Sequence, residues 1–118
     1  MKDNEIILKV AFFQTSNGKE PVRDWLLSLT DAQKKAIGVE IKVVQYGWPL
    51  GMPVVRKMTN DLWEVRINLG NRIARILFTS HQGIMVLLHG FIKKAQKTPA
   101  NDLKIAKQRM QILGGHNE

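Results

Sequence analysis

Apolar and polar residues alternate over the second half of the chain, where three successive segments have the pattern of strands. Leu62–Asn68 alternates as a strand with one buried face does, and Gly70-Asn71 supplies a tight turn after it. Arg72–Ser80 follows, then a turn at His81-Gln82-Gly83 and a last strand at Ile84–Gly90. Together these segments predict an antiparallel meander.

Apolar residues three and four positions apart predict three helices. A short helix, Val22–Leu29, is opened by a proline, and a longer one over residues 31–46 begins after the capping residue Thr30. The last helix is predicted to have Thr98-Pro99 as its N-cap and first helical position, and to end at Gly114-Gly115.

The first part of the chain predicts one more strand, Ile6–Phe13, and Gly51–Asp61 is predicted to be a loop with a short extended piece at Val54-Val55. The resulting order is β-α-α-β-β-β-α. It predicts an α+β fold, with an antiparallel sheet and helices packed mainly on one face. At this length we expect residues 1–118 to form a single domain.

Charge changes this picture more than composition does. The net charge is +8, and no Asp or Glu occurs from Val65 to Asn101, a stretch that holds several cations. A one-sign stretch of this length favours a polyanionic partner, and nucleic acid above all. No apolar run approaches the ~18 residues that a membrane span needs, and the N-terminus lacks the features of a signal peptide. We therefore expect a cytoplasmic protein with no membrane partner.

The predicted turns place two of these cations side by side. With Gly70-Asn71 at the centre of a two-residue turn, Arg66 lies opposite Arg75 on the polar face of the hairpin. Like charges across a strand pair destabilise a sheet, whereas guanidinium groups match the oxygens of a phosphate. We therefore predict that Arg66 and Arg75 bind a phosphate. The alternatives are that both are merely solvated, or that the turn is longer and the pairing different.

Three lysines follow the last strand and precede a predicted helix N-terminus, where free N–H groups favour anions. We predict that Lys93, Lys94 or Lys97 orients RNA or moves a proton, with Lys93 and Lys94 as catalytic candidates; a solvated basic loop is the alternative. The residues predicted only to bind RNA are Arg72, Lys97, Arg56 and Lys57.

The second turn determines what is expected of the one histidine in a strand. A two-residue turn at Gln82-Gly83 puts His89 opposite Ile76 and Gly90 opposite Arg75. His89 would then lie on the apolar face as a core residue, although histidine is the commonest general base. Gly90 would leave open space beside Arg75, where a ligand could approach the backbone.

The carboxylates are scattered along the sequence, which disfavours two-metal hydrolysis, and no phosphate-loop, nucleophile-elbow or zinc motif occurs. The chain also has no cysteine. We therefore predict no metal and no cofactor. RNA can be cut without either, because its 2′-hydroxyl can attack the adjacent phosphate. Arginines would stabilise the added negative charge, and a lysine among other cations has its pKa lowered toward general-base competence.

The stretches LWEVRI, RIARILF and VLLHGFIKKAQKTP resemble the phage-derived HigB-like branch of the RelE/ParE superfamily of type II toxin–antitoxin toxins. The resemblance covers most of the chain, including NGKEPVRDWLLSL. It implies a RelE-type fold, an antitoxin partner with a helix-turn-helix domain, and cleavage of mRNA on the ribosome by basic residues. The positions that match are Arg66, Arg75, Lys93, Lys94 and Lys97.

The chain departs from that family pattern in one respect. Many toxins of the superfamily use a tyrosine or histidine near the C-terminus, but here the only tyrosine is Tyr46, and His116 lies in a predicted tail. The proton-transfer groups therefore stay open. So do two other functions: a ParE-like toxin that inhibits DNA gyrase by binding, and a non-enzymatic basic RNA-binding module, for which an exposed row of stacking aromatics is not predicted.

Overall fold

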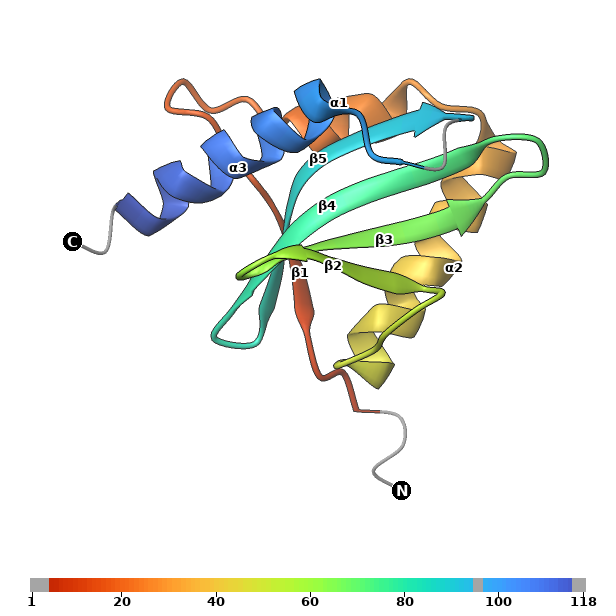
Figure 1. Ribbon diagram of the computed structural model, residues 1–118, viewed down its shortest axis with the longest axis horizontal. Helices are drawn as coiled ribbons and strands as arrows, with labels where there is room; N and C mark the ends of the chain where they lie inside the picture. Colours follow the sequence, from red (N-terminus) through yellow and green to blue (C-terminus); the bar gives the residue numbers. More distant parts are fainter. Residues whose placement is uncertain (1–4, 95–96, 116–118) are drawn as a thin grey trace.

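A mixed β-sheet forms the centre of the molecule (Figure 1). The computed structural model describes residues 5–94 and 97–115, and in this part of the chain five strands pair in the order β1-β5-β4-β3-β2. The strands are β1 (Lys9–Phe12), β2 (Val55–Thr59), β3 (Leu62–Asn68), β4 (Ile73–His81) and β5 (Ile84–Lys93). The helices are α1 (Pro21–Leu27), α2 (Asp31–Gly47) and α3 (Ala100–Gly115).

The α+β class is confirmed, and the element order differs from the predicted one by the strand β2. This strand lies where a loop was predicted and pairs antiparallel with β3. The sheet is mixed rather than antiparallel because β1 pairs parallel with β5, from Lys9 opposite Ile84 to Phe12 opposite Leu87. The alternation of apolar and polar residues in a strand does not reveal the direction of the neighbouring strand, so the parallel pairing of β1 with β5 could not be predicted from the sequence pattern.

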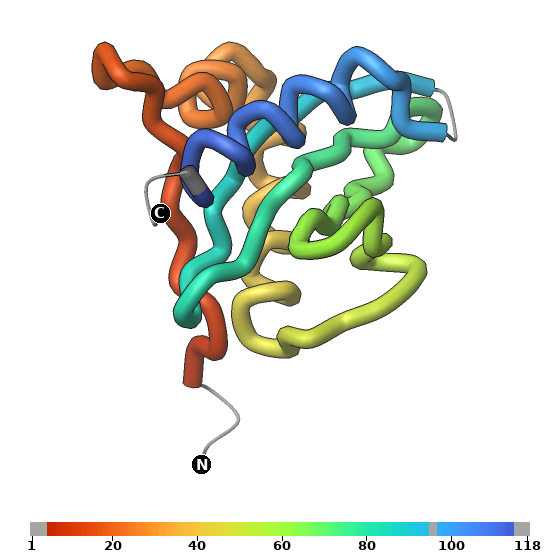
Figure 2. The backbone as a smooth tube through the Cα atoms, turned by 60° about the vertical axis from the view of Figure 1, so that its left-hand side comes forward, coloured from red at the N-terminus to blue at the C-terminus, as the bar shows by residue number. Residues whose placement is uncertain are grey.

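Helices cover both faces of the sheet (Figure 2). On one face, α2 packs Ile37 and Val44 against strand residues such as Ile76, and α1 lies on the same side. On the opposite face, α3 packs Ala106 against Leu77. The prediction that helices share one face therefore holds for α1 and α2, and α3 lies on the other. None of the helices in the described residues is long and apolar enough to cross a membrane.

Of the two N-caps that the sequence predicts for the long helices, one is confirmed and one is wrong. The Thr30 side chain accepts the N–H of Gln33, and the Gln33 side chain accepts the N–H of Thr30, so the predicted cap of α2 is confirmed as a capping box. At α3 the prediction is wrong. The carbonyl of Pro99 accepts the N–H of Leu103, so Pro99 is in the cap position, and Thr98 lies before the helix.

A β-bulge between β4 and β5 determines which side chains share a face. The tight turn before β5 is as predicted, but the register shifts between Leu77 and Phe78, where Leu88 is the extra residue. The resulting pairs are Leu77 with His89, Ile76 with Gly90 and Arg75 with Phe91. The predicted partners of His89 and Gly90 are therefore wrong by one residue. Because one residue of slip exchanges the two faces, His89 lies on the α3 face and not in the α2-side core.

Gly90 does not open a path for a ligand, contrary to the prediction. A Cβ atom at this position would lie 2.5 Å from Cε3 of Trp25 and would also overlap Cζ3 of the same indole. The indole of α1 occupies the space that the missing side chain leaves, so Gly90 is a packing residue between α1 and β5.

We expect Gly90→Ala to destabilise the fold by about 1–3 kcal/mol, because the added methyl group overpacks the indole contact. Chemical denaturation measures this change. The matched control is Gly38→Ala in α2, where a Cβ atom would meet nothing within 4 Å and alanine favours helix. Equal stability of Gly90→Ala and the parent chain would contradict this account of the contact.

Candidate functional site

The β3–β4 hairpin brings Arg66 opposite Arg75, as the sequence predicts. The two side chains differ in exposure. Arg75 is fully buried, at 0% relative exposure, with the ring of Phe91 5.9 Å from its guanidinium carbon, whereas Arg66 is half-buried. Solvent therefore reaches Arg66, while Arg75 lies beneath the surface of the same face.

Arg75 is surrounded by charges of both signs. Burial lowers the pKa of its guanidinium, the carboxylates of Glu64 and Asp102 act in the opposite direction, and Arg66 and Arg56 lower it further. An arginine remains protonated under such influences because its ordinary pKa exceeds ~12. The sheet face under α3 therefore holds a cluster of three arginines and two carboxylates.

Asp102, in the first turn of α3, connects this cluster to β5. Its Oδ1 lies 2.7 Å from Nε2 of His89, and its Oδ2 accepts a hydrogen bond of 2.9 Å from Nζ of Lys93. The Asp102 side chain is 9% exposed and that of His89 16%, whereas that of Lys93 is 48% exposed. One buried carboxylate thus fixes a histidine and a solvent-accessible lysine side by side.

The ionisation of Asp102 follows from these contacts. Burial alone would raise the pKa of its carboxyl group, but the hydrogen bonds from His89 and Lys93, together with their charges, bring the pKa below its ordinary value. Asp102 is therefore an anion at neutral pH. Its contact with Nε2 of His89 leaves Nδ1 as the ring nitrogen that Asp102 does not engage.

A second buried contact holds the segment before α3 against the sheet. The hydroxyl of Thr98 donates a hydrogen bond of 2.5 Å to Oε2 of Glu64 on β3, and both residues are buried. The start of α3 is consequently attached to β3 through Thr98 and to β5 through Asp102. This double attachment positions the cationic side chains around the helix start.

Two of the predicted cations line a hollow beside this cluster. Arg66 and Lys94 border a cavity of about 540 Å³ together with Glu40 of α2 and the hairpin residues Asn68 and Asn71. The cavity opens at the end of the β3–β4 hairpin. The structure thus brings Arg66 and Lys94 together at one concave surface; that they bind phosphate stays a prediction.

The other predicted cations are more dispersed. Arg56 is exposed and pairs with Glu64, so it shares the face of the arginine cluster. Lys57, the next residue, lies on the opposite face by the alternation of the strand. Arg72 is exposed at the hairpin end, and Lys97 is exposed just before Thr98. Lys93, predicted to lie in a loop, is the last residue of β5.

Sequence reasoning missed Asp102 and set aside His89. Asp102 was one of several scattered acids, and only the docking of α3 on β5 shows that it meets a histidine and a lysine. The usable signal was its place in the first turn of a helix that directly follows the basic segment. Of the alternatives, Tyr46 lies on α2, across the sheet from α3, and His116 lies outside the described residues.

A family model described as "Phage derived protein Gp49-like (DUF891)" matches residues 24–111, well over half of the chain. The chain belongs to the Gp49-like family. The matched segment includes the arginine cluster, the bulge in β5 and Asp102, so the site described above lies within the part that defines the family.

Two further comparisons complete the placement of this Gp49-like chain. No curated protein sequence matches it. Among solved structures, the archaeal RelE-RelB complex from Pyrococcus horikoshii OT3 is similar with a TM-score of 0.47 and 18% identity, over 78% of this chain and 100% of that one.

The lowered pKa of Asp102 makes a prediction about stability. A carboxyl group whose pKa is lower in the folded state contributes stability above its unfolded pKa, near ~3.9, and loses it as pH falls through the folded value. We therefore expect Asp102→Asn to be less stable than the parent chain at pH 7, with the difference shrinking as the pH falls below ~4.

Denaturation of both chains at a series of pH values measures this difference. Asp31→Asn is the control, because Asp31 is exposed and its pair with Lys34 is a surface pair of 3.6 Å. A difference between Asp102→Asn and the parent that stays constant down to pH 2 would contradict the role assigned to Asp102.

Proposed function

We propose that this Gp49-like chain is the toxin of a type II toxin–antitoxin system and an endoribonuclease that cleaves mRNA. Membership of a family of RelE-type, phage-derived proteins supports the toxin class. The observation that supports cleavage is the buried carboxylate of Asp102, which holds His89 and Lys93 together beside the arginine cluster. This combination offers a proton-transfer group, a solvent-accessible cation and a positive field in one place.

The reaction that suits these groups uses RNA's own nucleophile. The 2′-oxygen forms a bond to the adjacent phosphorus, and the bond from phosphorus to the 5′-oxygen breaks. A base takes the proton of the 2′-hydroxyl, and an acid gives a proton to the departing 5′-oxygen. The products are a 2′,3′-cyclic phosphate and a 5′-hydroxyl, and no metal or cofactor enters the balance. Charge stabilisation at phosphorus and proton transfer are the two tasks left to the protein.

His89 is the group that we assign to proton transfer. Its Nε2 is engaged by Asp102, which fixes the orientation of the ring. Nδ1 is then the atom that exchanges a proton with RNA. Asp102 acts through His89 and is a positioning residue, in the way that a carboxylate orients a catalytic imidazole.

We assign the phosphate contacts to those cationic side chains that are exposed to solvent. Lys93, whose side chain is 48% exposed, shares Asp102 with His89, and Arg66 is half-buried on the same face of the sheet; we assign to both the stabilisation of the charge that develops on the phosphate. Lys94 extends this surface through the hollow that it shares with Arg66. Arg75 was predicted to bind phosphate directly; because it is buried, we assign it a supporting role, in which its charge acts from below.

The remaining cations extend the proposed RNA path away from the cut. Arg56 shares the face of the arginine cluster, and Arg72 and Lys97 are exposed at the two ends of this region. Lys57 lies on the opposite face of the edge strand β2, so RNA would reach it only by passing around this edge. These contacts are sequence-independent, as contacts of lysine and arginine to phosphate generally are.

The resemblance of LWEVRI, RIARILF and VLLHGFIKKAQKTP to the HigB-like branch supports a more specific proposal. The partner would be an antitoxin with a helix-turn-helix domain, and the substrate would be mRNA on the ribosome, in the cytoplasm. The positive net charge of +8 suits a protein that approaches the polyanionic ribosome.

We expect Arg66→Ala and His89→Ala each to slow cleavage of mRNA by at least about 100-fold, the effect typical of removing a charge-stabilising or proton-transferring group. Mapping of mRNA 5′ ends in a translating extract measures this. The control is Arg23→Ala, an exposed arginine of α1 on the far side of the sheet, which should cleave at the parent rate.

The same samples discriminate between the functions. Parent-level cleavage by both variants would refute the assignment of Arg66 and His89. A parent chain that leaves mRNA intact but blocks supercoiling by DNA gyrase would be a ParE-like inhibitor. Binding of RNA with neither effect would identify a non-enzymatic RNA-binding module.

A further inference from the structure

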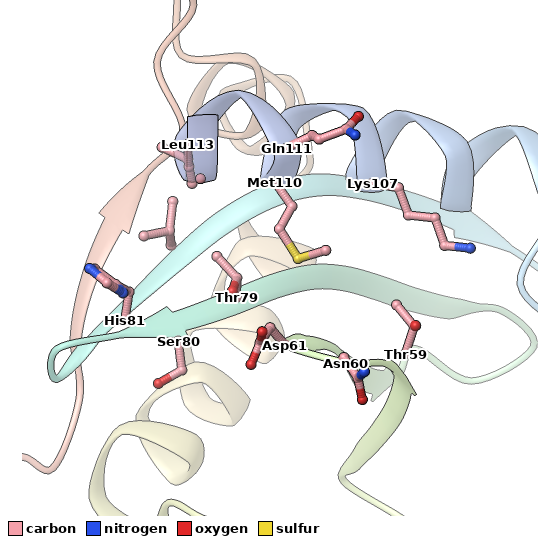
Figure 3. A pocket seen from close by; sticks show the side chains of 12 residues that line it. Thr59, Asn60, Asp61, Thr79, Ser80, His81, Lys107, Met110, Gln111 and Leu113 are labelled. Carbon is pink, nitrogen blue, oxygen red and sulfur yellow. The ribbon is translucent and has the colours of Figure 1, made fainter. Parts of the chain in front are cut away.

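A larger cavity lies on the same face of the sheet, at the opposite end of α3 (Figure 3). Its volume is about 860 Å³, and it is enclosed by the C-terminal half of α3, the turn between β2 and β3, and the end of β4. The residues that the proposed function uses lie at the start of α3, around Asp102. This cavity is therefore a separate site under the same helix.

The lining of the cavity combines apolar surface with hydrogen-bonding groups. Val86, Met110 and Leu113 supply the apolar part, and Figure 3 shows the Met110 side chain reaching from α3 toward β4. The polar groups come from two elements, Asn60 and Asp61 from the turn and Thr79 from β4. Ser80 and Gln111 also border the cavity, but Figure 3 shows their side chains directed away from the space between α3 and β4.

We propose that this cavity binds an unpaired base of the RNA substrate and that Asp61 selects which base is bound. This inference rests on the proposed function. A nucleobase has two apolar faces and an edge of donors and acceptors, which is the combination that the lining offers. Proteins read single-stranded RNA through such contacts to splayed-out bases, and cavities of ~300–1,000 Å³ are usual for small ligands.

Charge distinguishes this cavity from the cationic end of the same face. Its lining holds one carboxylate, Asp61, and one ammonium group, Lys107, with His81 as the other titratable residue. A phosphate gains little from such a balance, whereas the cluster around Arg66 and Lys93 attracts it. The two ends therefore match the two parts of a nucleotide chain, phosphate at one and base at the other.

The spacing allows one RNA strand to reach both ends. Arg75 and Thr79 are four residues apart on β4, so their side chains lie on the same face, about 13 Å apart at ~3.3 Å per residue. Lys93 lies opposite Ile73, six residues from Thr79, so RNA that passes over β4 beside α3 with its cut phosphate near Lys93 would have to span about 20 Å to place a base at Thr79, a distance of a few nucleotides. A base bound here would thus set the position of the cut.

The chemistry of Asp61 predicts the direction of the preference. A carboxylate only accepts hydrogen bonds, so it favours bases that present an amino group, such as cytosine, over uracil. An asparagine at this position offers both a donor and an acceptor and loses the distinction. The backbone φ of Asp61 is 62°, a conformation that asparagine adopts as readily as aspartate, so the exchange leaves the turn intact.

The test compares cut sites made by the parent chain and by Asp61→Asn on the same pool of mRNA in translating ribosomes. We expect the ratio of cuts at amino-bearing bases to cuts at uracil, at one fixed position near the cut, to fall by about tenfold, the usual effect of losing a base contact. Asp31→Asn, an exposed acid on α2, is the control and should keep the ratio. An unchanged ratio in Asp61→Asn would overturn the proposal.

A binding measurement separates this proposal from the proposed cleavage. The chain has five methionines, so the methyl resonance of Met110 can be followed in the full-length protein by NMR. The probes are 2′-deoxy tetranucleotides, which lack the nucleophile and are not cut. We expect Met110 to respond to the cytosine-containing probe at a concentration at which the uracil-containing probe has at least tenfold less effect.

A Met110 methyl group that responds equally to both probes, or to neither, would contradict the base-binding role even if mRNA is cut. If the parent chain cuts no mRNA but Met110 distinguishes the probes, the cavity is a base-binding site and only the cleavage proposal fails.

Discussion

The carboxylate of Asp102 is the contact on which the site depends. A buried charge is tolerated only when it is paired and hydrogen-bonded, and both oxygens of Asp102 meet that requirement, one with His89 and the other with Lys93. Because these partners are on β5 and Asp102 is on α3, the pairing also docks the helix on the sheet. The same interaction therefore fixes the position of α3 and the geometry of the proposed catalytic groups.

Local signals in the sequence predicted the elements well. Thr30 and Gln33 formed the expected capping box, and the turn residues Gly70-Asn71 gave the correct β3–β4 register, with Arg66 opposite Arg75. Such features depend on neighbours in sequence. The extra residue Leu88 in β5 depends instead on tertiary packing, since it is buried with Leu77 and Ala106 on the α3 side, and so the face of His89 was predicted wrongly.

The pair Arg66 and Arg75 shows what the distribution of charge along the sequence can predict about a site and what it cannot. Arg66 opposite Arg75 predicted an anion between them, and the anions that the structure shows near Arg75 are the carboxylates of Glu64 and Asp102. Glu64 is close to Arg66 in sequence, but Asp102 comes from a helix that only the fold brings near. An absence of acids in one stretch of sequence is thus no guide to the charges around it in space.

Phosphate binding, proton transfer and base recognition are all assigned to one face of the sheet. The α3 helix covers all three, with Asp102 in its first turn and Met110 in its last half. The opposite face, under α1 and α2, is a hydrophobic core in which Trp25 fills the space over Gly90. Because the hydrophobic core under α1 and α2 lies on one face of the sheet, the cations of the second half of the chain can cluster on the other face without weakening that core.

The chemistry of the new mRNA ends tests the central claim most directly. The parent chain would be added to translating ribosomes, and the 5′ ends of the mRNA fragments would be examined for a hydroxyl or a phosphate. Attack by the 2′-hydroxyl predicts 5′-hydroxyl ends, paired with 2′,3′-cyclic phosphates, that vanish in His89→Ala. Fragments with 5′-phosphate ends, or mRNA that remains intact, would contradict the account.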